Sequence, residues 1–244
     1  MTQAIQKKLN DSAFARWTAL ILVALTMFFG YMFVDVLSPL QNMLESTRGW
    51  SPTIFGLYGG SEFILNVCGF LLVAGIILDK MGVRFTGILS ASLMVLGAGI
   101  KFYGLSNYFY EGGFGYEFLS SFLTDIPASA KLACLGFMVF GCGTEMAGVT
   151  VSRAIVKWFT GKELALAMGL EMAIARLGVF AVFSLSPWVA NWGGDPSVAR
   201  PVAVVGLLLC IGLLTYIAFS VMDFKLDRQT EADTPIGETE EPFK

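Results

Sequence analysis

The sequence predicts an all-α membrane protein with six transmembrane helices. Of its 244 residues, 55% are hydrophobic, 14% are charged and none is histidine, and the mean hydropathy is +0.69. A water-soluble domain does not bury so much apolar surface. The apolar residues form long runs that are hydrophobic on every face, whereas the strands of a membrane barrel alternate between apolar and polar residues. Both observations favour helices that span a membrane.

Six runs are long enough for this, because a bilayer core of about 30 Å requires about 20 mostly apolar residues in a helix. The clearest are residues 17–34 and 201–222, which contain no charged side chain. The six predicted spans cover residues 17–39, 53–78, 86–104, 131–152, 164–187 and 201–222. They define a bundle over residues 17–222, which follows a cytoplasmic N-terminus, residues 1–16.

The distribution of lysine and arginine predicts the orientation, because positively charged loops stay on the cytoplasmic side. If the N-terminus is inside, the cytoplasmic set is Lys7, Lys8, Arg16, Lys80, Arg84, Arg153, Lys157, Lys162, Lys225, Arg228 and Lys244. The opposite side carries only Arg48, Lys101, Lys131 and Arg200. Both termini are therefore expected in the cytoplasm. The first run is too long for the apolar region of a signal peptide and no small-residue cleavage site follows it. With no organelle-directed segment visible, we expect a bacterial cytoplasmic (inner) membrane.

Two polar segments lie outside the spans. Residues 105–130 form an external insertion with several tyrosines and acidic residues, and a solvated or interface-lying insertion is favoured over a substrate gate. Residues 223–244 are polar and acidic enough to be disordered, as a cytoplasmic tail or a central linker.

Several classes of function lack support in the sequence. The four cysteines lie in predicted spans without metal-ligand spacing, and no histidine is present to build the usual zinc sites. No phosphate-binding loop and no Ser/His/Asp set is found, so neither an enzyme nor ATP-driven pumping is indicated. The net charge of -3 argues against nucleic acid as a partner. We therefore expect no metal, no cofactor and no nucleic acid.

Ionisable residues inside the spans carry the functional information, because a charge in hydrocarbon costs several kcal/mol and usually faces a cavity or a partner. Glu145 in the fourth span lies roughly 12 Å from the inner face, and Arg176 in the fifth lies about 18 Å from it. A long arginine side chain spans this difference if the helices are neighbours. The pair either pins the helices together or receives a substrate with an amine and a carboxylate, since a guanidinium binds carboxylates bidentately and Glu145 suits an ammonium group.

Other polar residues are candidates for the same pathway. Glu62 and Asn66 are four residues apart and share one face of the second span. Tyr31 and Asp35 lie near the outer end of the first span. Glu171, in the fifth span, is a second charge partner or faces an inner vestibule. For Asp35 and Glu62, contact with substrate or protons and plain hydrogen bonding between helices are equally supported.

Two loop motifs suggest a family. The segment Gly75-Ile-Ile-Leu-Asp-Lys-Met-Gly82-Val-Arg84-Phe85, between the second and third spans, resembles the loop signature of the major facilitator superfamily. The Trp158-Phe-Thr-Gly-Lys-Glu-Leu164 loop and the Ala175-Arg-Leu-Gly178 step resemble a dipeptide uniporter branch of that superfamily. The resemblance covers nearly all six spans, with residues 105–130 as the exception.

The resemblance implies one half of a major facilitator fold that moves short peptides or similar amphoteric solutes by alternating access. In that branch the residues that match Glu145 and Arg176 contact the dipeptide termini. The loop signature implies a conformational latch, in which Gly75 allows tight packing, Gly82 belongs to the turn, and Asp79 and Arg84 relay charge. A basic residue is common where this chain has Val83, so a weaker latch is expected.

The length of the chain leaves alternatives open. Transporters of this superfamily have twelve helices in two halves with the site between them, so the chain is either the N-terminal part of a longer protein or a half-transporter that pairs with a second six-helix half. Organic anions or sugars are alternative substrates, with Arg176 alone as the anchor. An accessory membrane subunit that does not transport is the alternative from another class.

Overall fold

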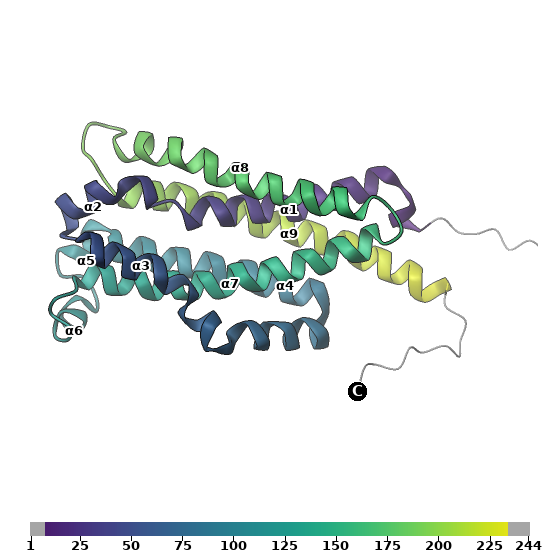
Figure 1. Cartoon of the computed structure of the whole chain (residues 1–244), viewed down its shortest axis with the longest axis horizontal. Coiled ribbons are helices and arrows are strands. Elements are labelled where there is room, and N and C mark those ends of the chain that lie inside the picture. The colour runs from purple at the N-terminus through teal and green to yellow at the C-terminus, as the bar shows by residue number, and fades with distance from the viewer. Residues whose placement is uncertain (1–7, 234–244) are drawn as a thin grey trace, which may run out of the picture.

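The structure, a computed structural model, describes residues 8–233, and within these residues it contains helices and no strand. The long helices lie side by side along one axis (Figure 1). In chain order the elements are η1 (Leu9–Asp11), α1 (Ala13–Val34), η2 (Ser38–Leu40), α2 (Gln41–Arg48), α3 (Pro52–Leu65), η3 (Asn66–Phe70), α4 (Leu71–Leu105), α5 (Asn107–Tyr110), α6 (Tyr116–Ser120), α7 (Ala128–Phe159), α8 (Leu164–Ala190) and α9 (Ala199–Asp233). The all-α prediction is confirmed.

Five helical stretches in the described chain are long and apolar enough to cross a membrane, and one of them, Pro52–Leu105, contains 54 residues. That is far longer than one crossing requires. The backbone turns back at Gly82, where φ is 74° and ψ is 174°, and Figure 1 shows the chain reversing there. A side chain at this position would be strained, since positive φ favours glycine. The stretch therefore makes two passes, which correspond to the predicted spans 53–78 and 86–104.

The helices form two groups that pack against each other. Helices α8 and α9 both pack on α1, and α3 and α4 both pack on α7. Contacts between α4 and α9 and between α1 and α7 join the groups (Figure 1). We call the end where the chain turns at Gly82 the Gly82 end and the opposite one the Leu105 end.

Small residues set the spacing of the helices, as is usual where lipid replaces water. A Cβ atom on Gly97 of α4 would lie 2.8 Å from the Cα of Phe140 in α7, and one on Gly136 of α7 would lie 2.6 Å from the backbone nitrogen of Lys101 in α4. Polar bonds add to this packing, since the Thr26 hydroxyl of α1 donates to the Gly212 carbonyl of α9 at 2.9 Å. Close approach of the backbones thus holds the helices together within each group.

Three expectations need comment. Helix α9 continues to Asp233, so residues 223–233, predicted as part of a disordered tail, are helical. Asp223, at the start of this stretch, is fully buried and pairs with Lys157. Lys101, assigned to the external loops, lies inside α4 with no exposed surface. Residues 1–7 and 234–244, which hold the rest of both predicted terminal segments, lie outside the described residues.

The insertion 105–130 folds as two short helices, α5 and α6, at the Leu105 end. The guanidinium of Arg48 donates to the Leu105 carbonyl at 3.1 Å and to the Asn107 amide oxygen at 2.6 Å, and the ammonium of Lys131 donates to the carbonyls of Leu119 and Phe122. Two basic residues therefore fasten the insertion to the helices beside it.

Gly97 and Gly99 give a matched test of helix packing. Gly97→Ala forces a methyl group onto the backbone of α7 and should lower the free energy of unfolding by about 1–3 kcal/mol. Gly99→Ala, two residues further on, meets no atom within 4 Å and should be neutral or raise it by up to about 1 kcal/mol. Thermal unfolding of the detergent-solubilised variants measures both, and equal effects would contradict the close approach of α4 and α7.

Candidate functional site

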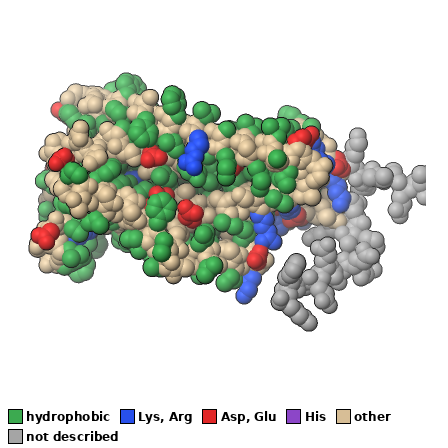
Figure 2. All heavy atoms as spheres, viewed as in Figure 1, with side chains coloured by type: hydrophobic (Ala, Val, Ile, Leu, Met, Phe, Trp, Pro, Cys, Tyr) green, Lys and Arg blue, Asp and Glu red, His purple; other side chains and the backbone are tan. Residues whose placement is uncertain are grey.

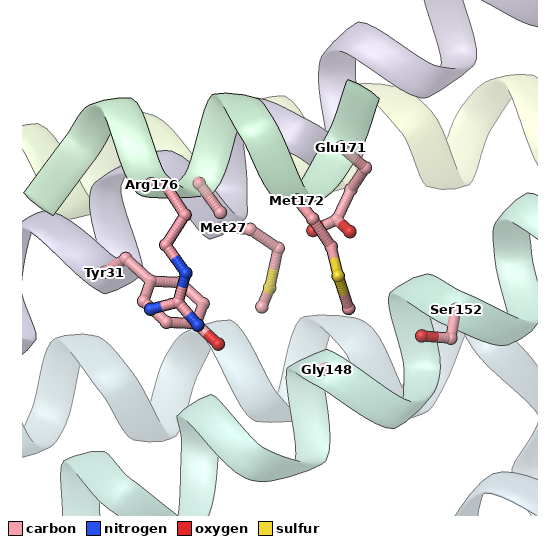
Figure 3. Close-up of a pocket in the computed structure, with 8 residues that line it drawn as sticks. Met27, Tyr31, Gly148, Ser152, Glu171, Met172 and Arg176 are labelled. Atoms are coloured by element: carbon pink, nitrogen blue, oxygen red, sulfur yellow. The ribbon is translucent and has the colours of Figure 1, made fainter. Parts of the chain in front are cut away.

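A cavity of about 180 Å³ opens between α1, α7 and α8, halfway along the bundle. Figure 3 shows that α8 contributes its charged side chains and that α7 faces them with Gly148 and Ser152. Its lining is Met27, Tyr31, Gly148, Ser152, Glu171, Met172, Ala175 and Arg176. The site thus combines one cation, one carboxylate, two hydroxyls and two thioethers.

Arg176 projects from α8 over the ring of Tyr31, with 4.9 Å from its guanidinium carbon to the ring centre (Figure 3). This is within the range of a cation–π interaction. The side chain is exposed, although it lies at mid-length of an apolar helix. Figure 2 shows charged side chains at mid-length of this face, between hydrophobic ones, and a larger group at the right-hand end.

The structure does not bring Glu145 and Arg176 together as an ion pair. Among the ion pairs of the described chain, with a limit of 4.0 Å, none joins these two residues. Glu145 is half-buried on α7 and does not line the cavity. Glu171, which is 7% exposed, points into it. The described chain therefore shows no contact through which Glu145 and Arg176 would hold their helices together.

Glu62 and Asn66 lie where the second span breaks. Helix α3 ends at Leu65 and is followed by a π-turn, Asn66–Phe70, in which Gly69 has a φ of 107°. The Asn66 amide donates to the backbone carbonyl of Glu62 at 3.3 Å, so the two residues share one face as expected. Such π-turns within helices are often found at functional sites.

Glu62 and Asp35 belong to a second charged region, nearer the Leu105 end. Glu62 is 5% exposed and interacts electrostatically with Lys101, Glu145 and Asp35. The Asp35 carboxylate accepts a hydrogen bond of 2.9 Å from the Ser38 hydroxyl. The residues selected from the sequence thus divide into an Arg176 group, with Tyr31 and Glu171, and a Glu62 group, with Asn66, Asp35 and Glu145.

The residues of the loop signature lie at the Gly82 end and form two separate contacts. Asp79 pairs with Arg153 of α7. Arg84 pairs with Asp227 of α9 at 3.3 Å and is 4.0 Å from Asp223. Asp79 and Arg84 thus reach different helices rather than each other. A Cβ atom on Gly75 would meet nothing within 4 Å, so no part of the described chain packs tightly there.

Asp223 is the buried anion of this end. Its carboxylate accepts a hydrogen bond of 2.8 Å from the Lys157 ammonium and one of 3.0 Å from the indole of Trp158. These partners come from α7 and Arg84 comes from α4, so Asp223 fastens three helices together. One turn further along α9, Asp227 is 2.6 Å from the same lysine, but its side chain is 31% exposed.

The N-terminal turn is tied to the α7–α8 loop. The Lys162 ammonium donates to the Asp11 carboxylate at 2.8 Å, and Arg16 pairs with Glu163 at 3.3 Å. The hydrogen bond from Lys162, with one from the Lys8 backbone, holds the pKa of Asp11 below its usual value. The stabilisation by the Asp11–Lys162 contact is therefore fully present when the pH is above the usual pKa of an aspartate. It is lost only as the pH falls through the lowered pKa of Asp11.

Sequence reasoning missed Lys101, Asp223 and Gly69. The signal for Lys101 was present, because it is the one charge in the predicted span 86–104 and an ionisable residue in a span is a candidate by default. Asp223 directly follows the last predicted span, and only its partners on other helices show that it is buried. Nothing local distinguishes Gly69 from the many other glycines.

Long apolar helices, a charged cavity among them and a cluster of ion pairs at one end define an integral membrane protein of the transporter type. The sequence matches the Major Facilitator Superfamily over residues 20–244. The chain belongs to this family, whose members move small molecules across lipid bilayers.

Several curated proteins with similar sequences carry the name lysosomal dipeptide transporter MFSD1. The protein of Pongo abelii is 24% identical over 225 residues, which are 87% of this chain and 43% of that protein. The protein of Bos taurus is 31% identical over 101 residues, 38% of this chain and 22% of that protein, and that of Danio rerio is 42% identical over 55 residues, 22% and 12% respectively. The chain covers less than half of the length of these relatives.

Asp223 and Asp227 provide a matched pair for the charge cluster. Asp223→Asn removes the buried carboxylate that accepts hydrogen bonds from Lys157 and Trp158 and should lower the free energy of unfolding by about 2 kcal/mol. Asp227 also pairs with Lys157 but is partly exposed, so Asp227→Asn should lower the free energy of unfolding by at most about 1 kcal/mol. Denaturant titration in mixed micelles compares them; a larger loss for Asp227→Asn would show that the buried carboxylate does not anchor α9.

Proposed function

We propose that the chain forms the N-terminal half of a transporter for short peptides or similar amphoteric solutes, working by alternating access. Membership of the family supports transport in general, and the dipeptide transporters among its relatives suggest the substrate class. The chain itself contributes the charged cavity between α1, α7 and α8.

The observation that carries this proposal is the state of Arg176. Its guanidinium lies in the cavity against Tyr31, and no carboxylate of the described chain pairs with it. A planar guanidinium binds a carboxylate through two parallel hydrogen bonds. The side chain is thus available for the carboxylate terminus of a substrate, with the aromatic ring fixing its plane.

The other substrate terminus requires an anion. Glu145 and Glu62 interact with each other, and Asn66 lies beside Glu62, so this acidic region suits an ammonium group. Met27 and Met172 line the cavity beside Arg176, and flexible thioethers adapt to apolar groups of different shape. A site with fixed charges and adaptable walls suits solutes that share their termini and differ in side chains.

The second half would complete the site. The Arg176 side chain is exposed, and nothing in the described chain packs on Gly75, although the loop signature implies close packing there. Another six-helix half, in the same polypeptide or in a separate one, would cover both. The proposed setting is a bacterial inner membrane with the Gly82 end and both termini in the cytoplasm.

The two contacts of the loop signature fit a latch in this arrangement. Asp79 with Arg153, and Arg84 with Asp227, join α4 to α7 and to α9. Both pairs are partly exposed, so a movement of the second half could exchange their partners at small cost. We propose that they stabilise one state of the cycle.

An organic-anion transporter is the second candidate. The cavity that contains Arg176 does not include Glu145. An anion without an amine would need only Arg176 for binding. Competition separates the two: free dipeptides should outcompete N-acetylated ones if an acidic group recognises the amine, and both should compete equally if Arg176 is the sole anchor.

Charge-conserving and charge-removing variants test the site. In the complete transporter reconstituted in vesicles, Arg176→Lys and Glu145→Gln should each reduce counterflow of labelled alanylalanine at least about tenfold. Lysine cannot bind a carboxylate bidentately, and glutamine loses the charge of a contact worth about 1.5–3 kcal/mol. Arg200→Lys is the control, since Arg200 binds loop carbonyls near α9. Normal counterflow in both site variants would refute the assignment.

A further inference from the structure

Glu171 of α8 is a buried carboxylate that lies in the same cavity as Arg176. It is 7% exposed and belongs to the lining of that cavity, and Figure 3 shows its carboxylate pointing inward. Within the described chain its side chain takes part in no ion pair, with a limit of 4.0 Å, and in no hydrogen bond. An ionisable group in a membrane-spanning helix usually faces a cavity or a partner. Here the cavity is what it faces.

The elements around Glu171 supply no cation that could neutralise it. Helix α1 contributes Met27 and Tyr31 to the lining, and α7 contributes Gly148 and Ser152. Among the described residues that line the cavity, Arg176 alone is basic, and it does not pair with Glu171. A buried carboxylate is stable as an ion only with an opposite charge nearby. The cavity therefore suits a ligand that brings a positive charge.

The cavity has opposite charges at its two ends. Glu171 and Arg176 are five residues apart on α8, so their backbone positions differ by about 7.5 Å along the helix axis. Figure 3 shows the two charged groups with Met27 between them. A cation and an anion that stay apart in one cavity can each bind a different group of the same solute.

A dipeptide has its two charged groups at a matching separation. From its ammonium nitrogen to its carboxylate carbon, an extended dipeptide spans an N–Cα bond, one Cα–Cα step and a Cα–C bond, which together reach about 6–7 Å. In a free amino acid both groups are attached to one Cα atom and lie about 2.5 Å apart. With the carboxylate on Arg176, the ammonium group of a dipeptide can therefore reach Glu171, whereas that of an amino acid cannot.

We infer that Glu171 is a further substrate-binding residue, which receives the ammonium group of a dipeptide whose carboxylate is bound to Arg176. The inference rests on the proposed function and adds a second ammonium site to it. The Glu62 group lies toward the Leu105 end, whereas Glu171 lies on the Gly82 side of Arg176. As alternating access opens one side and then the other, the ammonium group passes from the Glu62 group to Glu171 while the carboxylate stays in place.

Counterflow of labelled alanylalanine by the complete transporter in lipid vesicles tests the inference. Glu171→Gln keeps the size of the side chain and removes its charge, so counterflow should fall at least about tenfold, as expected when a charge-assisted hydrogen bond is lost. N-acetylalanylalanine keeps the carboxylate and lacks the ammonium group, so its weaker inhibition should be the same in the wild type and in Glu171→Gln. Glu45→Gln is the matched control, because Glu45 is exposed on α2 and outside the cavity, and it should leave counterflow unchanged.

Each other outcome has a distinct meaning. Undiminished counterflow in Glu171→Gln would overturn the inference and leave the proposed function standing. So would an equal loss of inhibition by the free and the acetylated dipeptide, since that indicates a general loss of structure. If the variant does not fold, the wild type still decides, because alanylalanine should inhibit at least about tenfold better than alanine, and equal inhibition would overturn the inference. A wild type without alanylalanine counterflow would refute the proposed function and the inference together.

Discussion

The cost of a charge in a medium without water governs the arrangement of polar residues in this bundle. Three cations, of which Lys101 is buried, Lys157 is half-buried and Arg176 is exposed, illustrate three solutions. Lys157 is neutralised by direct contact with Asp223, Lys101 is surrounded by aromatic rings at a distance from its carboxylates, and Arg176 rests on one ring and is otherwise open. Only the first contributes chiefly to stability. In the proposed function, Arg176 keeps its hydrogen-bond donors for the carboxylate of a substrate.

Backbone contact between helices makes these arrangements rigid enough to matter. Gly97 and Gly136 bring α4 and α7 together just where Lys101 leaves α4, and Gly141 does the same where Glu62 faces α7. A side chain at any of these glycines would push the facing helix away. The small residues thus determine charge placement as well as packing.

Much of the fold was predictable from the sequence, because hydrophobic length alone identifies membrane spans. The reversal at Gly82 and the candidate Arg176 also follow from local patterns. The partner of each charged side chain could not be predicted from such patterns. Nothing near Glu145 or Arg176 in the sequence tells that they do not pair, and Asp223 looks like the start of a polar tail until α4 and α7 are placed beside it. Depth along a helix can be counted, whereas the direction of a side chain around it depends on packing between segments far apart in the sequence.

The break at Asn66–Phe70 divides the second crossing into a part with Glu62 and a part with Asp79, which lies nearer the Gly82 end. An unbroken helix would tilt as one rigid body, so a movement at one membrane face would also occur at the other. Here a joint with a glycine at positive φ lies between them, so the two parts can rotate by different amounts. In the proposed transport cycle, the carboxylate region can therefore keep its geometry while the part with Asp79 moves.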